Sequence, residues 1–301
     1  MKPPSESFSK GDAVEEWVDL KFFRPIGAWI VRRLARTRVT ADEVTLWALV
    51  TGLLAGHLFV YADARLNFAG FLLFVVSDVF DSADGQLARF RGTTSRWGRI
   101  VDGLSDNARW ANFYLHLIFR LAVLEHDPGG ALLAVAAGVA QSFQATAIDG
   151  IRLAYLELSG AGGRPVDLPE RVARVRAGDA RQRIGLWLYR IYVNRIARLL
   201  PATLELVRRD RGQGADARRR EARGEEFAKR QRAVVANCAW LGHNLRFALL
   251  GLLPLLGGVR GFLWITLVPL TVVMASLLYR YERNAASLLR ADATAVEGAI
   301  P

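Results

Sequence analysis

Long apolar blocks separated by short polar linkers dominate the chain. Each block is long enough to cross a hydrocarbon core of about 30 Å, which takes about 20 helical residues. The segment 262–278 contains no charged residue, whereas a soluble helix of that length would show a polar face. The pattern therefore predicts an all-α polytopic membrane protein with six transmembrane helices. The blocks are Val44–Tyr61, Leu66–Phe80 (its helical pattern continuing to Phe90), Gly98–Leu124, Gly129–Leu156, Ala233–Leu256 and Gly261–Tyr279.

Two further segments alternate apolar and basic residues at helical spacing. Glu16–Arg36 repeats large apolar residues with Lys and Arg between them and Pro25 inside it, and Ile184–Val207 has a similar pattern. Both are predicted to be amphipathic helices lying at the membrane surface, the first with a partner-docking helix as its alternative. We expect a cytoplasmic leader over residues 1–40, a membrane domain over 41–301, and a basic cytoplasmic insertion at about 157–230.

Composition and charge narrow the class of protein. The 301 residues are 52% hydrophobic with a formal net charge of +11, and Cys238 is the only cysteine. So apolar a chain is not intrinsically disordered, and one cysteine excludes a disulfide scaffold. A basic excess on an apolar chain suits either a nucleic-acid binder or a membrane protein with basic cytoplasmic loops.

The position of the charge decides between these two classes. The linkers near residues 62–65, 125–129 and 256–261 carry few basic residues. The positive-inside rule therefore places the basic segments and both termini in the cytoplasm, and no secretory signal precedes the first block. We expect no nucleic-acid partner, because anionic lipid explains a polybasic stretch beside a membrane. The basic segments are Arg32–Arg38, Arg89–Arg99, Arg152–Arg232 and Arg280–Arg290.

Four aspartates lie where two apolar blocks reach the cytoplasmic side. At about 100° per residue, Asp81 and Asp84 share one helix face, and Asp102 and Asp106 share a face of the next helix. Ionisable residues within spans are costly and functional by default. If the two faces meet, the carboxylates repel one another unless a cation binds them, and an all-oxygen site suits Mg²⁺ or Mn²⁺.

The depth of these aspartates suits chemistry between water and lipid. From Leu66 to Asp81 a helix rises about 22 Å, which places Asp81 near the cytoplasmic edge of the hydrocarbon core. Small residues at Gly85, Ala88 and Gly98 allow a backbone or a flat ligand to approach closely. Arg89 supplies positive charge for a phosphate group.

These residues form one spaced motif. Its eight positions read Asp81-x2-Asp84-Gly85-x2-Ala88-Arg89-x8-Gly98-x3-Asp102-x3-Asp106. The motif resembles the signature of the CDP-alcohol phosphotransferase family, and the six spans and amphipathic leader also look like that family. The resemblance implies transfer of a phosphoalcohol group from a CDP-alcohol to an acceptor hydroxyl, with release of CMP.

By matching position, the resemblance implies roles for each motif residue. Asp81, Asp84 and Asp102 would be metal ligands, and Asp106 would be the general base that also touches a metal, with two Mg²⁺ or Mn²⁺ ions bound. The nucleotide would be bound by Gly85, Ala88, Arg89 and Gly98. Members often carry a Pro-Asn-x-x-Thr pattern before the first span, to which Ala41, Asp42 and Thr45 correspond here.

Weaker candidates for substrate contact are Asp42, Asp78, Asp149 and Arg152. Asp78 lies one turn before Asp81 and is either a supporting residue of the site or a solvated neighbour. Asp149 and Arg152 close the fourth block, where they line the acceptor pocket or pair with each other.

The leading hypothesis is an integral-membrane enzyme that moves a phosphatidyl group from CDP-diacylglycerol to an alcohol. In the alternative, a soluble CDP-alcohol donates its head group to a lipid or a polyol phosphate, and the motif serves both. A metal-binding transporter is a minor alternative that would place carboxylates at mid-span. The composition suggests a bacterial inner-membrane protein, and the resemblance implies a homodimer.

Overall fold

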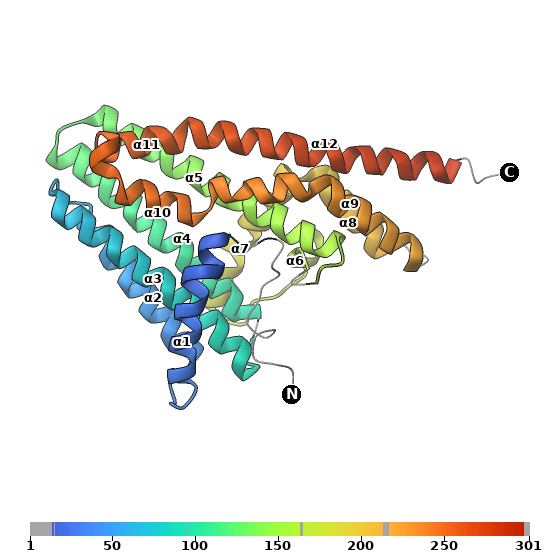
Figure 1. Cartoon of the computed structure of the whole chain (residues 1–301), viewed down its shortest axis with the longest axis horizontal. Helices are drawn as coiled ribbons and strands as arrows, with labels where there is room; N and C mark the ends of the chain where they lie inside the picture. The colour runs from blue at the N-terminus through green and yellow to red at the C-terminus, as the bar shows by residue number, and fades with distance from the viewer. Residues whose placement is uncertain (1–13, 15, 95, 163–164, 213–216, 298–301) are drawn as a thin grey trace. The chain divides into compact units, whose positions relative to one another are not determined.

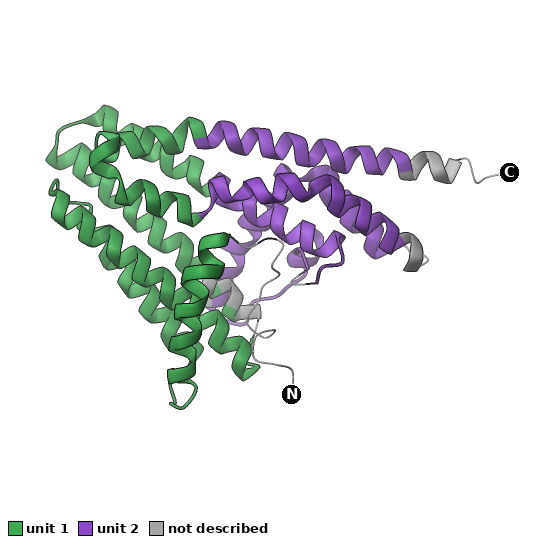
Figure 2. Cartoon of the chain, in the orientation of Figure 1, with its two compact units in different colours: residues 1–9, 15–142, 243–269 green, residues 10–14, 143–242, 270–301 purple. Residues whose placement is uncertain are grey.

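The computed structural model describes residues 14, 16–94, 96–162, 165–212 and 217–297 (Figure 1). The chain divides into two compact units (Figure 2). Within the described ranges, unit 1 comprises residues 16–142 and 243–269, and unit 2 comprises residues 14, 143–242 and 270–297. All regular elements in the described ranges are helical, which confirms the all-α prediction.

Unit 1 carries the first four helices and the start of the fifth. It also contains π-helical turns at Asp19–Phe23 and Arg120–Leu124 and a 3-10 turn at Leu253–Leu256. The α-helices are α1 (Arg24–Leu34), α2 (Ala41–Leu58), α3 (Ala64–Arg91), α4 (Arg96–Phe119), the first half of α5 (Pro128–Leu158), α10 (His243–Gly251) and α11 (Val259–Leu267).

Local sequence signals set the ends of α2 and α3. Thr40 and Glu43 form a capping box, in which each side chain satisfies the other residue's backbone N–H at the start of α2. The Asp63 side chain accepts hydrogen bonds from two backbone N–H groups at the start of α3. Gly92 ends α3 in the left-handed region, with φ 66°, where a side chain would be strained. These signals fix the 28 residues of α3 that carry the first half of the motif.

An aromatic cluster forms the core of unit 1. Phe74 of α3 stacks on Trp110 of α4 with ring centroids 5.3 Å apart, and Phe113 meets Phe59 edge to face at 4.9 Å. Phe262 of α11 is fully buried against Phe113. Because Phe74 of α3 stacks on Trp110 of α4 inside this cluster, burial of the rings sets the rotation of α3 against α4.

The N-terminal amphipathic segment forms α1 and the turn before it. Pro25 lies in the first turn of α1, where a missing N–H costs no hydrogen bond. Gly27 packs on α3, because a Cβ there would lie 2.7 Å from Gln86 Nε2 and 3.3 Å from the Ala83 nitrogen. Trp29 stays 53% exposed on the other side. The amphipathic character predicted for this segment is thus retained.

Unit 2 contains the basic segment and two long helices. Its core joins α5, α9 and α12, since Phe227 meets Tyr281 at 5.9 Å and Tyr281 donates a hydrogen bond to the Ile151 carbonyl at 3.1 Å. The second amphipathic segment is divided at Pro201 into α7 and α8. The elements are the second half of α5, α6 (Pro169–Ala173), α7 (Ala180–Leu199), α8 (Pro201–Gly212), α9 (Ala217–Asn237), a 3-10 turn at Cys238–Leu241, and α12 (Pro269–Glu297).

Three helical stretches are long and apolar enough to cross a membrane: Ala64–Arg91, Pro128–Leu158 and Val259–Ala291. They coincide with the second, fourth and sixth predicted blocks, and the full set of six spans is not confirmed. The fifth block, Ala233–Leu256, is divided by the turn at Cys238–Leu241 and by Gly242, which has an extended backbone. The three apolar stretches indicate a membrane-associated protein.

Candidate active site

The first two motif aspartates lie on α3, with Asp78 one turn earlier. Asp84 is 4% exposed, whereas the side chains of Asp81 and Asp78 are 24% and 15% exposed. Unpaired carboxylates at such depth would lose hydration without compensation. Their partners therefore decide what the site can do.

A single arginine, Arg109 of α4, contacts three carboxylates, those of Asp78, Asp81 and Asp106. Its guanidinium donates to Asp81 Oδ1 at 3.0 Å and to Asp106 on its own helix, and lies 3.7 Å from Asp78 Oδ1. It also donates to Ser77 Oγ at 2.7 Å. Arg109 is only 4% exposed, so these contacts replace most of its hydration. Asp81 of α3 and Asp106 of α4 thus both contact the Arg109 guanidinium, whereas the convergence of all four aspartates on a metal stays a prediction.

A glycine on α2 makes room for that arginine. A Cβ at Gly52 would lie 2.3 Å from Arg109 Cδ and 2.8 Å from Ser77 Oγ. Ser77 in turn donates a hydrogen bond to the Ala48 carbonyl of α2 at 2.6 Å. The close approach of α2 therefore holds the arginine stem against α3 and α4.

Asp84 has a partner on α2. The Thr45 hydroxyl donates to Asp84 Oδ2 at 2.6 Å, and the same hydroxyl lies 3.1 Å from the Ala41 carbonyl. Asp42, the position proposed for substrate contact, is exposed in the first turn of α2. Of the residues matching the pattern before the first span, Thr45 is therefore the one that reaches the motif.

The positions proposed for nucleotide binding lie on the same two helices. Gly85, Ala88 and Arg89 follow Asp84 on α3, and Gly98 is half-buried on α4. A Cβ at Gly85 would lie 3.3 Å from an Arg89 guanidinium nitrogen, so the arginine folds back along its own helix over the glycine. A flat group could take that space only if Arg89 moved or stacked on it.

The metal site stays a prediction. No three His, Cys, Asp or Glu side chains are arranged to hold one ion within the described part of the chain, and the Asp102 side chain lies outside that part. The donor chemistry nevertheless fits Mg²⁺ or Mn²⁺, because the acids that meet at Arg109 offer only oxygen ligands. A guanidinium among three carboxylates also shows that this position favours positive charge.

Two predicted substrate contacts belong to unit 2. Asp149 of α5 is exposed and accepts a hydrogen bond from the Tyr192 hydroxyl of α7 at 3.5 Å. Arg152 lies one turn further along α5 and is half-buried. Their place in an acceptor pocket stays a prediction.

Sequence reasoning missed the most connected residue of the site. Arg109 follows Asp106 by three residues inside an apolar block, and a basic residue in such a block is itself a sign of function. Gly52 was missed as well, because its role depends on which side chain lies opposite it. Thr45 was noted only as part of the pattern before the first span.

The comparison with known proteins agrees with the motif. No curated protein shows significant similarity to the chain. Residues 38–162, which contain the whole motif together with Thr45, Gly52 and Arg109, match the family model for CDP-alcohol phosphatidyltransferase, and the family resemblance is thereby confirmed for this segment.

Proposed function

We propose that this protein transfers a phosphatidyl group from CDP-diacylglycerol to an acceptor alcohol and releases CMP. The family implies transfer of a phosphoalcohol or phosphatidyl group from a CDP-alcohol. The choice of a lipid donor, the acceptor and the metal dependence are our proposals.

One observation carries the proposal. Asp81 of α3 and Asp106 of α4 share one buried guanidinium, so acids from both halves of the motif converge in one place. Phosphoryl transfer depends on positioning and charge neutralisation more than on covalent help from the protein. A convergent set of acids beside half-exposed small residues suits that chemistry.

The proposed reaction is a displacement at phosphorus. The acceptor hydroxyl oxygen forms a bond to the phosphorus that bears the diacylglycerol, the bond from that phosphorus to the CMP oxygen breaks, and Asp106 takes the hydroxyl proton. Asp81, Asp84, Asp102 and Asp106 would hold two Mg²⁺ or Mn²⁺ ions. Such ions neutralise the diphosphate and the departing CMP.

Exposed apolar stripes support a lipid donor. On α2, Leu46, Val50 and Leu54 recur every four residues and are 46–54% exposed, and on α3 Phe68, Leu72 and Val76 do the same at 41–53%. A helix face of this kind suits acyl chains. A donor whose acyl chains lie along these helices reaches the aspartates from the bilayer side.

We further propose that the site faces the cytoplasm of a bacterial inner membrane. The end of α3 that follows Asp84 carries Arg89 and Arg91, whereas the opposite end carries the single Arg65. That asymmetry agrees with the positive-inside rule. The homodimer stays an expectation from the family resemblance.

The test is CMP release by the full-length protein in detergent–lipid micelles. CDP-diacylglycerol is supplied with inositol, inositol phosphate, glycerol 3-phosphate or serine, each with Mg²⁺, with Mn²⁺ or with a chelator. A parallel series supplies a soluble CDP-alcohol with diacylglycerol as acceptor. We expect metal-dependent CMP only from CDP-diacylglycerol. CMP from the second series alone would transfer the assignment to the head-group reaction.

Asp106→Asn tests the proposed base. It should lower turnover by about a hundredfold or more, while CDP-diacylglycerol still binds. Asp63→Asn is the matched control, because Asn also caps a helix and Asp63 lies at the far end of α3. Folded protein that releases no CMP from any CDP-alcohol would overturn the enzyme assignment, and full activity of Asp106→Asn would overturn the base assignment.

A further inference from the structure

Unit 2 contains a basic pocket that the proposed reaction does not use. It has a volume of about 780 Å³ and lies between α7 and the loop that precedes it. Four arginines and no acidic residue line it: Arg174, Arg176, Arg183 and Arg190. A concentration of positive charge without carboxylates suits a ligand that brings its own negative charge.

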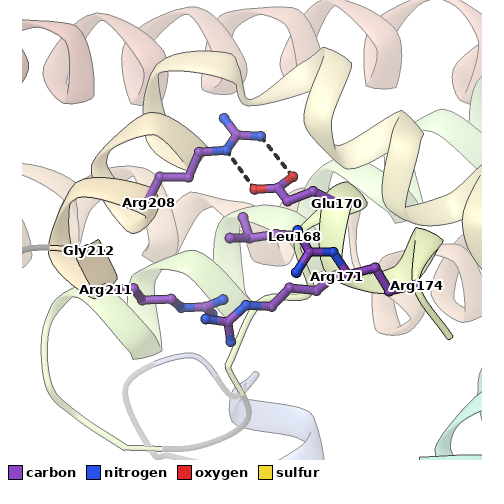
Figure 3. A pocket seen from close by; sticks show the side chains of 7 residues that line it. All are labelled: Leu168, Glu170, Arg171, Arg174, Arg208, Arg211 and Gly212. Atoms are coloured by element: carbon purple, nitrogen blue, oxygen red, sulfur yellow. Dashed lines mark hydrogen bonds and ion pairs between the residues drawn. The ribbon is translucent and has the colours of Figure 1, made fainter.

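In the neighbouring pocket of unit 2, two arginines form ion pairs with glutamates of the chain. Arg208 of α8 forms an ion pair with Glu170 of α6 (Figure 3), with 3.0 Å between Nε and Oε1. Arg211 of α8 forms an ion pair with Glu157 of α5 at 2.7 Å. The hydrogen bond from Arg208 lowers the pKa of Glu170, so this pair stays ionised at neutral pH. Carboxylates of the chain therefore already balance those guanidinium groups.

Hydrogen bonds hold the larger pocket in shape, but no carboxylate of the described residues lines it to balance the charge of its arginines. Arg190 donates hydrogen bonds to the carbonyls of Ala173 and Val175, each at 3.1 Å, which holds the loop against α7. Arg174, Arg176 and Arg183 are exposed, and their side chains make no hydrogen bond or ion pair with any residue in the described ranges. The pocket thus presents three guanidinium groups, two on the loop that Arg190 holds and one on α7, and such groups suit the oxygen atoms of a phosphate.

An apolar stripe on α7 adjoins these arginines. Ile184, Trp187 and Ile191 lie on one side of the helix and are 62%, 60% and 38% exposed. Trp187 lies four residues after Arg183 and three residues before Arg190, so the stripe and the pocket wall are adjacent on one helix. Exposed Trp and Ile beside Arg are typical of a helix in the membrane interface.

From these observations we propose that the loop at 173–178 and α7 bind the phosphate group of an acidic phospholipid. The guanidinium groups bind the phosphate oxygens, and the stripe of Ile184, Trp187 and Ile191 contacts the acyl chains. The proposed site uses none of the motif aspartates and does not depend on the catalytic proposal. It gives the basic segment a role in recognising anionic lipid.

The test measures binding by the full-length protein in a neutral detergent. Dioctanoyl phosphatidic acid and dioctanoyl phosphatidylcholine are titrated separately, and bound lipid is counted by native mass spectrometry. Arg174→Gln combined with Arg183→Gln should weaken phosphatidic acid binding by about thirtyfold, since each arginine near an anionic surface contributes about a fivefold effect. Arg232→Gln with Arg280→Gln is the matched control, because both residues are exposed in unit 2 outside the pocket.

Soluble anions separate the two possible sources of phosphate. Inorganic phosphate and glycerol 3-phosphate should displace phosphatidic acid only at far higher concentration, and Trp187→Ala should weaken lipid binding while leaving the soluble anions unaffected. Unchanged binding by the Arg174 and Arg183 double variant would overturn the site. Equal affinity for glycerol 3-phosphate and the lipid, or no effect of Trp187→Ala, would overturn the lipid assignment.

Discussion

Replacing Arg109 with methionine removes the cation from the carboxylate cluster while keeping most of the apolar side-chain volume. Asp78, Asp81 and Asp106 then face one another without a counter-charge, at side-chain exposures of 15%, 24% and 32%. The structure therefore predicts a loss of stability that depends on whether a divalent metal is present.

The magnitude follows from the burial of the arginine. Removing one partner of a buried ion pair costs about 3–5 kcal/mol, and the partial exposure of the three acids favours the lower end, about 3 kcal/mol without metal. A metal that binds only the folded protein, at a hundred times its dissociation constant, contributes about 2.7 kcal/mol. Because the proposed metal would neutralise the same Asp81 and Asp106 that Arg109 contacts, the variant should gain more from metal than the parent protein does.

The assay is thermal unfolding in detergent with EDTA and with saturating Mg²⁺. Arg120→Met provides the matched control, since Arg120 is also buried on the same continuous helical stretch. It pairs with Glu125 at 2.6 Å and donates to the Tyr61 carbonyl at 3.0 Å, away from the motif. Both variants should be destabilised in EDTA, and only Arg109→Met should be largely rescued by Mg²⁺. Equal destabilisation of Arg109→Met in both buffers would refute the reasoning.

Two smaller changes probe the walls of the same site. Gly52→Ala should lower stability and CMP release together, because the new methyl group would lie 2.3 Å from Arg109 Cδ. Gly103→Ala is the control, because a Cβ there meets nothing within 4 Å. It should leave CMP release unchanged and leave stability unchanged or slightly raised. Thr45→Val removes the 2.6 Å hydrogen bond to Asp84 and should weaken Mn²⁺ binding by about tenfold in a calorimetric titration. The CMP yield at saturating metal should be unaltered. Unchanged Mn²⁺ affinity would show that this bond does not orient the carboxylate.

Local sequence patterns predicted the scaffold of the site well. The motif lies on two consecutive helices, and helical periodicity alone determines that Asp81 and Asp84 share one face of α3. The stop at Gly92 and the cap at Asp63 are similarly local. Each of these features depends on residues within one or two turns of one another.

Features that depend on packing between helices escaped prediction. The position of Arg109 among acids of α3 depends on how far α4 is rotated, which the aromatic core sets through Phe74 and Trp110. Hydropathy also failed to predict that the fifth block is divided, because it counts apolar residues and does not detect a break in the helix. Gly242 there has an extended backbone at φ −72° and ψ 173°. A span count from hydropathy therefore overestimates the continuous helix in this region.

The attachment of α1 to α3 has a mechanical consequence. The Gln86 side chain donates a hydrogen bond to the Arg24 carbonyl at 3.3 Å. The Arg91 guanidinium donates hydrogen bonds to the carbonyls of Leu34 and Thr37 at 3.1 and 3.0 Å. Both ends of α1 are thus tied to the last two turns of the helix that carries the first two motif aspartates. With α1 in the head-group layer, as its amphipathic pattern predicts, these bonds would set how far the motif aspartates lie from the membrane surface. Thinning or thickening the bilayer would be absorbed at the opposite end of α3, while the aspartates kept a constant distance below the plane of lipid phosphates.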